Sequence, residues 1–238
     1  MRDAVAVFRN QFNEFRKDKV LLLFFFLWLV MVLALPAISE MGFGEPDNWD
    51  YPSQIALGAG VMVAGGYMIG FLSPIIAKHR KEGHLSRVKL ISYLLGVGGF
   101  FVVLCMGVAL FIAWVGELRG HALANYMLIM LLAITCSILI AAIIGILSKT
   151  SKITLRISVP IGVAIGMLLK VRNGVPALQI IEPIRPFINW FYTERINNML
   201  IEVHTGNFMG DIYVVLGNIA FLTIVFTALC KMKRVKSM

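Results

Sequence analysis

Residues 90–115 read LISYLLGVGGFFVVLCMGVALFIAWV, and residues 122–147 read ALANYMLIMLLAITCSILIAAIIGIL. Neither stretch contains an acidic, basic or histidine side chain. A helix that crosses the hydrocarbon core of a bilayer needs about 20 apolar residues, because each residue advances it by only about 1.5 Å and unpaired backbone groups are costly there. Both stretches exceed this length. They therefore predict two membrane-spanning helices joined by a short loop.

The whole chain has the composition of a membrane protein. It contains 238 residues, of which 59% are apolar and 15% are charged, and its mean hydropathy is +0.83. Soluble domains rarely combine these values. The net charge of +9 comes from short basic stretches between apolar runs, so it indicates membrane orientation rather than a nucleic-acid partner. The odd number of cysteines argues against a disulfide framework, since all three lie inside apolar runs: Cys105, Cys136 and Cys230.

The sequence predicts an all-α membrane protein with six transmembrane helices. Five apolar runs are long enough to cross the bilayer, namely Val20–Ile38, Ile55–Ala77, Leu90–Val115, Ala122–Leu147 and Ile212–Cys230. A shorter run, Ile157–Leu169, is the expected fifth span, with Lys170 and Arg172 extending to the interface. Seventeen of the 22 basic residues precede the first span, follow the last, or lie in the second and fourth connections. Cytoplasmic loops retain positive charge, so both termini of this multi-pass plasma-membrane protein are predicted to be cytoplasmic.

Two segments outside the spans also have recognisable patterns. Residues 1–19 are predicted to form a cytoplasmic amphipathic helix ahead of the membrane domain at residues 20–238, because apolar side chains recur there at helical spacing: Val5, Phe8, Phe12 and Phe15. Residues 171–210 are too long for an ordinary loop and mix prolines with apolar and aromatic residues. We expect this outer segment to contain short re-entrant helices before the last span.

Glycine pairs within the spans indicate close helix packing. Gly66 and Gly70 form one GxxxG pattern, and Gly162 and Gly166 form another. Small residues let two helix backbones approach each other, although this pattern is too common to specify a dimer.

The connection between the second and third spans is the strongest positive feature. Residues 77–92 read AKHRKEGHLSRVKLIS, a polar segment with a dense mixture of charges. One interpretation is an ordinary positively charged loop on the cytoplasmic side. The functional interpretation is a docking element at residues 78–90 for a cytoplasmic partner, with these candidate residues: Lys78, Arg80, Lys81, Glu82, Gly83, His84 and Arg87.

Sequence motifs of enzymes and ion pumps are absent. The chain has no GxxxxGK[ST] loop, no GxSxG elbow and no HExxH pair, so no catalytic, cofactor-binding or metal-ligating residue is predicted. The four histidines lie in polar segments and are expected to be solvated or interfacial: His79, His84, His121 and His204. The spans other than the fifth lack interior ionisable residues, which disfavours a proton-driven pump. Any energy from ATP has to arrive from another polypeptide.

With these features, the sequence resembles the permease subunits of ABC transporters of the type-2 exporter family. The likeness covers nearly the whole chain: an amphipathic first helix, six spans, a charged segment after the second span and re-entrant outer helices. Arg80-Lys81-Glu82-Gly83 matches the charged run and glycine of that family's coupling helix, whereas His84 replaces the usual hydroxyl residue and the later proline is missing.

The resemblance implies an ATP-driven exporter of an amphipathic or hydrophobic cargo, such as a peptide, toxin, drug or lipid-like molecule. It implies two permeases, as a homodimer or a related heterodimer, and two cytoplasmic ABC ATPase subunits that hold ATP and magnesium. Two other classes stay open, namely a sodium-coupled or facilitative carrier that needs no partner, and a non-transporting membrane anchor or sensor. The sequence indicates no substrate-contacting residue.

Overall fold

The computed structural model of the chain describes residues 2–17, 19, 26, 30, 65–66, 68–81, 90–168 and 190–235. Within these ranges every regular element is a helix, and no strand occurs. The elements, in chain order, are α1 (Arg2–Lys17), the π-helix η1 (Met68–Leu72), α4 (Ser73–Lys81), α6 (Leu90–Val115), α7 (Gly120–Leu147), α8 (Ser151–Leu168), α10 (Tyr192–Ile201) and α11 (Met209–Val235).

Three described helices are long and apolar enough to cross a membrane, namely Ser92–Val115 in α6, all of α7, and Met209–Met232 in α11. The described residues confirm the predicted all-helical structure, and these three helices coincide with the predicted third, fourth and sixth spans. The predicted first span lies outside the described residues except for Phe26 and Val30. The second is described only in its later half, where η1 and α4 are helical.

The predicted short fifth span lies within α8, which begins six residues earlier, at Ser151. The helix therefore includes Lys152 and Arg156, both exposed, and it is not among the three helices that meet the length and hydropathy expected of a span. Pro160 lies inside α8 on its exposed side. A proline there removes one backbone hydrogen bond and weakens the helix locally.

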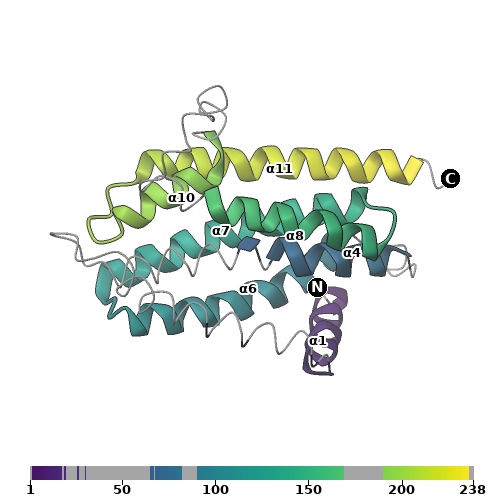
Figure 1. The fold of residues 1–238 in the computed structure, drawn as a ribbon, viewed down its shortest axis with the longest axis horizontal. Coiled ribbons are helices and arrows are strands. Elements are labelled where there is room, and N and C mark those ends of the chain that lie inside the picture. Colours follow the sequence, from purple (N-terminus) through teal and green to yellow (C-terminus); the bar gives the residue numbers. More distant parts are fainter. Residues whose placement is uncertain are drawn as a thin grey trace.

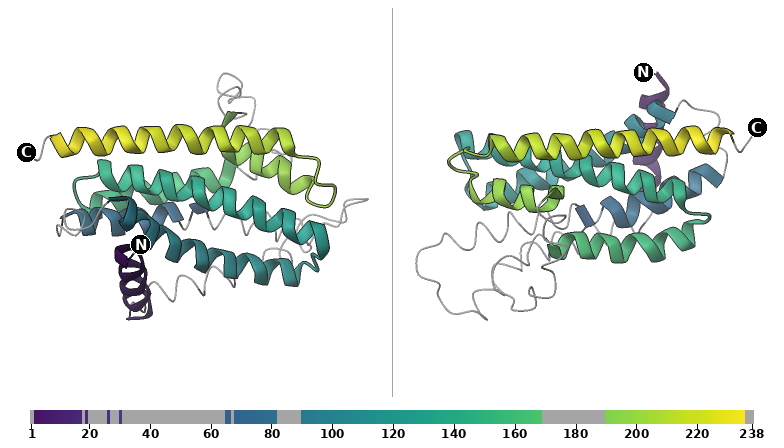
Figure 2. Two further views of the ribbon diagram at one scale, coloured as in Figure 1. Left: turned by 180° about the vertical axis from the view of Figure 1, so that it is seen from behind. Right: turned by 90° about the horizontal axis from the view of Figure 1, so that it is seen from above.

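The long helices lie side by side along one axis, and α1 crosses them at one end of the bundle (Figure 1). The carboxyl end of α11 and the connection between α7 and α8 lie toward this same end (Figure 2). The opposite end carries the turn between α6 and α7 and the connection between α10 and α11. The helix ends and the connections between helices therefore lie at the two ends of an apolar bundle, which is the arrangement expected of helices that cross a membrane.

The turn between α6 and α7 is short because α6 ends in two backbone bonds of the Schellman type. The Leu118 amide donates to the Ala113 carbonyl at 2.9 Å, and the Glu117 amide donates to the Trp114 carbonyl at 3.2 Å. Glu117 adopts a left-handed φ of 54° to make this turn. The following helix then runs antiparallel to α6.

Close glycine contacts hold the helices together. A Cβ atom added to Gly162 would lie 2.8 Å from the Gly66 carbonyl oxygen, so α8 and the segment before η1 touch backbone to backbone. The close helix packing that the glycines predicted is thus present, and the structure shows that Gly66 and Gly162 face each other. The Ser158 hydroxyl also donates across this contact to the Gly70 carbonyl at 3.4 Å. Because Gly70 lies in the π-helix, a cross-helix donor supports backbone that departs from regular α-helical bonding.

Candidate functional site

Three of the predicted docking residues lie in the last turns of α4, which is basic at its end. The side chains of Lys78 and Lys81 are exposed at the end of the bundle that carries α1. The remaining predicted residues, Glu82, Gly83, His84 and Arg87, lie outside the described residues. The structure therefore describes only the beginning of the predicted docking segment.

Arg80 has a structural role that the sequence did not suggest. Its guanidinium donates from Nη1 to the Ile146 carbonyl and from Nη2 to the Ser148 carbonyl, so it caps the carboxyl end of α7. The last carbonyls of a helix lack partners within the helix and carry partial negative charge, which a cation stabilises. Arg80 thus joins α4 to α7.

His79 is buried, contrary to the expectation of a solvated or interfacial histidine. Its Nδ1 lies 2.7 Å from the Tyr93 hydroxyl of α6, and its Nε2 lies 3.7 Å from Glu14 Oε2 of α1. The sequence missed this role because Tyr93 and Glu14 belong to separate segments. His121 and His204 are exposed as expected, and His84 lies outside the described residues.

The predicted amphipathic segment is a helix that packs its aromatic residues against α6. The rings of Phe8, Phe12 and Phe15 surround Phe100, with ring centroids 5.8, 6.3 and 5.5 Å from that ring. Phe15 is buried by this contact, whereas Val5 is 67% exposed and Phe12 47% exposed. The apolar side of α1 is therefore shared between the protein and its surroundings.

A cavity of about 270 Å³ lies where α1, α4 and α6 meet. Its lining consists of Asp3, Ala6, Val7, Asn10, Gln11, His79 and Tyr93. Most of these side chains are polar although the cavity adjoins an apolar bundle. The end of the bundle that carries α1 thus contains a polar junction of three helices.

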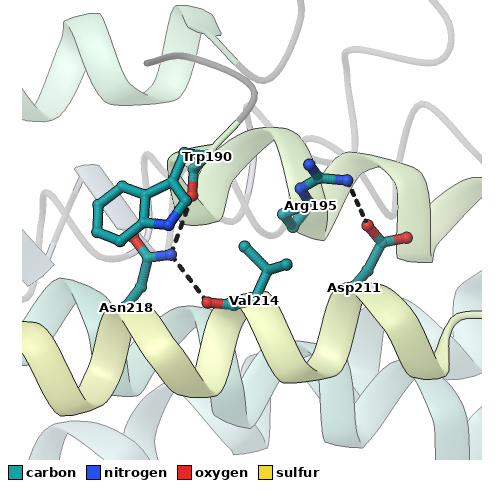
Figure 3. A network of polar contacts seen from close by, with 5 residues as sticks. All are labelled: Trp190, Arg195, Asp211, Val214 and Asn218. Carbon is teal, nitrogen blue, oxygen red and sulfur yellow. Dashed lines mark hydrogen bonds and ion pairs between the residues drawn. The ribbon is translucent and has the colours of Figure 1, made fainter. Parts of the chain in front are cut away.

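At the other end, α10 and α11 form a helical hairpin held by polar contacts (Figure 3). Arg195 donates to Asp211 at 3.0 Å, and both side chains are partly buried. Farther along α11, Asn218 Nδ2 donates to the carbonyls of Trp190 at 3.0 Å and Val214 at 2.9 Å. These pairs show that the two helices run antiparallel.

The same hairpin packs against α7 over much of its length. The Tyr192 hydroxyl lies 3.1 Å from the Ser137 hydroxyl, past the middle of α7. Near the beginning of α7, Asn125 Nδ2 donates to the Val203 carbonyl at 2.8 Å. The first turn of α10 therefore lies deep in the bundle, and its last turn lies near one end.

The α10 region contains buried polar atoms that have no hydrogen-bond partner among the described residues. They are Tyr126 Oη, Thr193 Oγ1, Arg195 Nε, Asn197 Nδ2 and Glu202 Oε2. Four belong to the stretch from Thr193 to Glu202, and Tyr126 lies on the neighbouring α7. An unpaired buried polar group costs about 1–3 kcal/mol. Several such groups close together are therefore unusual, and we treat this cluster of buried polar atoms as a candidate functional site. Its sequence signal is TERINN at residues 193–198, a polar run next to an apolar span.

Within the described ranges, no three His, Cys, Asp or Glu side chains come together to hold a metal ion. The described cysteines are free thiols. Comparison of the chain with models of known protein families and with curated proteins finds no match.

Proposed function

We propose that this protein is the membrane permease subunit of an ATP-driven exporter of the ABC type-2 class. It spans the plasma membrane six times with both termini in the cytoplasm, and two permeases assemble with two cytoplasmic ATPase subunits. ATP binding closes the ATPase subunits, the docking segments at residues 78–90 move with them, and the spans shift between inward and outward conformations. The cargo is amphipathic or hydrophobic.

The observation that carries this proposal is the way the base of the docking segment is tied to the bundle. Arg80 caps α7, and His79 contacts Tyr93 of α6 and Glu14 of α1. A displacement of the end of α4 is therefore transmitted to three other helices without a flexible joint. An ordinary orientation loop needs positive charge alone and no such links.

The distribution of charge supports the proposed orientation. Exposed cations lie on α1, at the end of α4, at the connection between α7 and α8, and near the end of α11: Arg9, Arg16, Lys17, Lys78, Lys81, Lys149, Lys152 and Lys231. These parts lie toward the same end of the bundle (Figure 2). That end is the cytoplasmic one under the positive-inside rule, and an ATPase docks there.

The α10–α11 hairpin supports the re-entrant outer segment. In the proposed orientation α10 begins deep in the bundle and ends near the outer side, as the contacts of Tyr192 and Val203 require. Its unpaired polar atoms would hydrogen-bond polar groups of an amphipathic cargo during passage, while the apolar helices contact the rest. A bare inorganic ion fits this apolar surface less well.

Reversal of the charge at Glu82 tests the proposal. If Glu82 pairs with a basic residue of the ATPase, its loss costs about 2–5 kcal/mol, and Glu82→Lys weakens ATPase retention or uncouples ATP hydrolysis from transport. The measurement is co-purification with the ATPase and transport-linked hydrolysis in liposomes. Lys149→Glu is the matched control, since Lys149 is exposed in a different connection at the same end.

If Glu82→Lys still binds the ATPase and still couples ATP hydrolysis to transport, residues 78–90 serve only to orient the chain in the membrane. Transport driven by a sodium gradient without any ATPase would instead identify a partner-independent carrier. A chain that binds no ATPase and moves no cargo would be an anchor or sensor.

A further inference from the structure

One face of α1 carries apolar and basic residues in a single line. Val5, Arg9, Phe12 and Arg16 follow one another at helical spacing, which places them on the same face of the helix. All four side chains are exposed. We call these four residues the outer stripe of α1.

The two carboxylates of α1 lie on a different side of the helix. Glu14 Oε2 lies 3.7 Å from His79 Nε2 of α4, and Asn10 Nδ2 donates to Glu14 Oε1 at 3.3 Å. Asp3 and Asn10 line the cavity that α1 shares with α4. The acidic side chains are thus turned toward α4, and the charges of α1 are separated around the helix.

Contacts with α6 show how deep α1 lies in the membrane. It touches α6 at Gly96 and Phe100. The part of α6 that can cross a membrane begins at Ser92. At about 1.5 Å per residue, the two contacts lie about 6–12 Å inside that beginning. A helix at the boundary between headgroups and acyl chains is buried by a similar amount, about 5–10 Å.

The orientation of α1 also fits that boundary. The helix crosses the axis of the bundle instead of running along it, so it lies along the plane of a membrane that the bundle spans (Figure 1). Its cavity side adjoins Tyr93, at the beginning of α6. The ring of Phe12 lies 6.3 Å from the ring of Phe100, which is about two turns farther into the span. The outer stripe therefore faces the acyl chains.

The two arginines of the outer stripe determine which lipids fit. A guanidinium is costly to leave in hydrocarbon, and the long arginine side chain can extend to the headgroups. There it meets phosphate oxygens, which it binds through paired, charge-assisted hydrogen bonds. The phosphate of a zwitterionic lipid is neutralised by the ammonium of the same headgroup. Two arginines on a face from which the carboxylates of α1 are turned away therefore favour lipids with net negative charge.

We propose that the outer stripe of α1 binds anionic phospholipids, with Val5 and Phe12 against the acyl chains and Arg9 and Arg16 on the phosphates. Binding holds α1 at the membrane surface, and it steadies the base of α4 because Glu14 contacts His79. The interaction does not depend on the proposed transport activity and is tested without an ATPase.

The test measures amide hydrogen exchange of residues 2–17 in the full chain. Nanodiscs of phosphatidylcholine are compared with nanodiscs of an equal mixture of phosphatidylcholine and phosphatidylglycerol. Each arginine near an anionic surface favours binding by about fivefold, so exchange of α1 should slow by about 25-fold in the mixture. High salt should remove most of this difference, because exposed charges are screened. Equal exchange of α1 in the two lipids would overturn the proposal.

Charge variants identify the residues responsible. Arg9→Gln combined with Arg16→Gln should remove most of the difference between the lipids, whereas lysine at both positions keeps the charge and most of the difference. Lys149→Gln combined with Lys152→Gln is the matched control, because it removes the same charge from exposed positions between α7 and α8. This control should leave the difference unchanged. An equal loss in the control would show an effect of net charge alone and overturn the assignment to the stripe.

Two further measurements test the placement of the stripe and the source of the phosphate. Val5→Thr should speed exchange of α1 by the same factor in both lipids, since acyl chains are common to both. If it leaves exchange unchanged in both, Val5 does not meet the acyl chains and the placement is wrong. Slower exchange on addition of millimolar inorganic phosphate in phosphatidylcholine alone would assign the arginines to a soluble anion and overturn the lipid source.

Discussion

Substitution of Gly96 by alanine gives a direct measure of how α1 is held on the bundle. Gly96 lies on α6 beneath α1, and an added Cβ would lie 2.6 Å from Val7 Cβ and 2.7 Å from the Ala4 carbonyl oxygen. Carbon atoms in good contact are about 3.5–4.0 Å apart, so α1 has to move by about 1 Å. Neither neighbour is the end of a flexible side chain, and a rotamer change cannot relieve the overlap.

The overlap sets the size of the effect, because overpacking of a close contact costs about 1–3 kcal/mol. Alanine also favours the helical state of α6 over glycine, but α6 is helical whether or not α1 is docked, so this gain does not change the docking equilibrium. The loss of α1 docking is therefore about 1–3 kcal/mol, which corresponds to about a 5- to 150-fold change in the docking equilibrium. The expected result is faster amide exchange in residues 2–17 and unchanged exchange in α7.

Hydrogen–deuterium exchange with mass spectrometry, on the purified chain in nanodiscs, measures this change. Gly107→Ala is the matched control, because Gly107 lies on the same helix and an added Cβ there would have no atom within 4 Å. That variant should leave α1 as protected as in the wild-type protein. If Gly96→Ala also leaves α1 fully protected, the close contact between α1 and α6 does not exist in the membrane.

Three further changes test other parts of the structure. Arg80→Ala should destabilise the contact between α4 and α7 by about 1.5–3 kcal/mol, because it removes a charged donor from two carbonyl groups. The measurement is thermal unfolding in detergent, and an unchanged unfolding temperature would contradict the role of Arg80 as a helix cap. A cysteine in place of Glu117 should react with a membrane-impermeant maleimide in intact cells, whereas a cysteine in place of Lys149 should react only after the cells are lysed. The reverse result would show that the proposed orientation in the membrane is inverted. Thr193→Val should raise thermal stability slightly while lowering transport, because it removes an unpaired buried hydroxyl; equal loss of both would make Thr193 a structural residue.

Local properties of the chain were sufficient to predict much of the fold. Hydropathy adds up along a segment, so α6, α7 and α11 could be recognised from their own residues. The amphipathic spacing of α1 is equally local, and α1 is a helix over Arg2–Lys17. The beginning of the helix that contains the predicted fifth span could not be predicted from hydropathy. The helix α8 already begins at Ser151 and includes the polar stretch up to Arg156, whereas hydropathy rises only after that stretch.

Contacts between segments that are far apart along the chain could not be predicted from the sequence. The glycine patterns predicted close packing, but only the tertiary structure shows that Gly66 faces Gly162 and that Gly96 faces α1. The basic residues of α4 looked alike in the sequence, whereas Arg80 caps α7, His79 is buried against Tyr93, and Lys78 stays exposed. The unpaired polar atoms along α10 are functional candidates only because neighbouring helices bury them.

The sequence by itself thus determined the class of protein, the three apolar helices described here and the charge asymmetry, since each depends on residues that are neighbours along the chain. Only the tertiary structure decided which polar groups are paired, which are left without a partner and where a cavity remains. Hydrogen bonds and cavities depend on the relative positions of helices far apart in sequence, and those positions follow from the packing of the whole bundle.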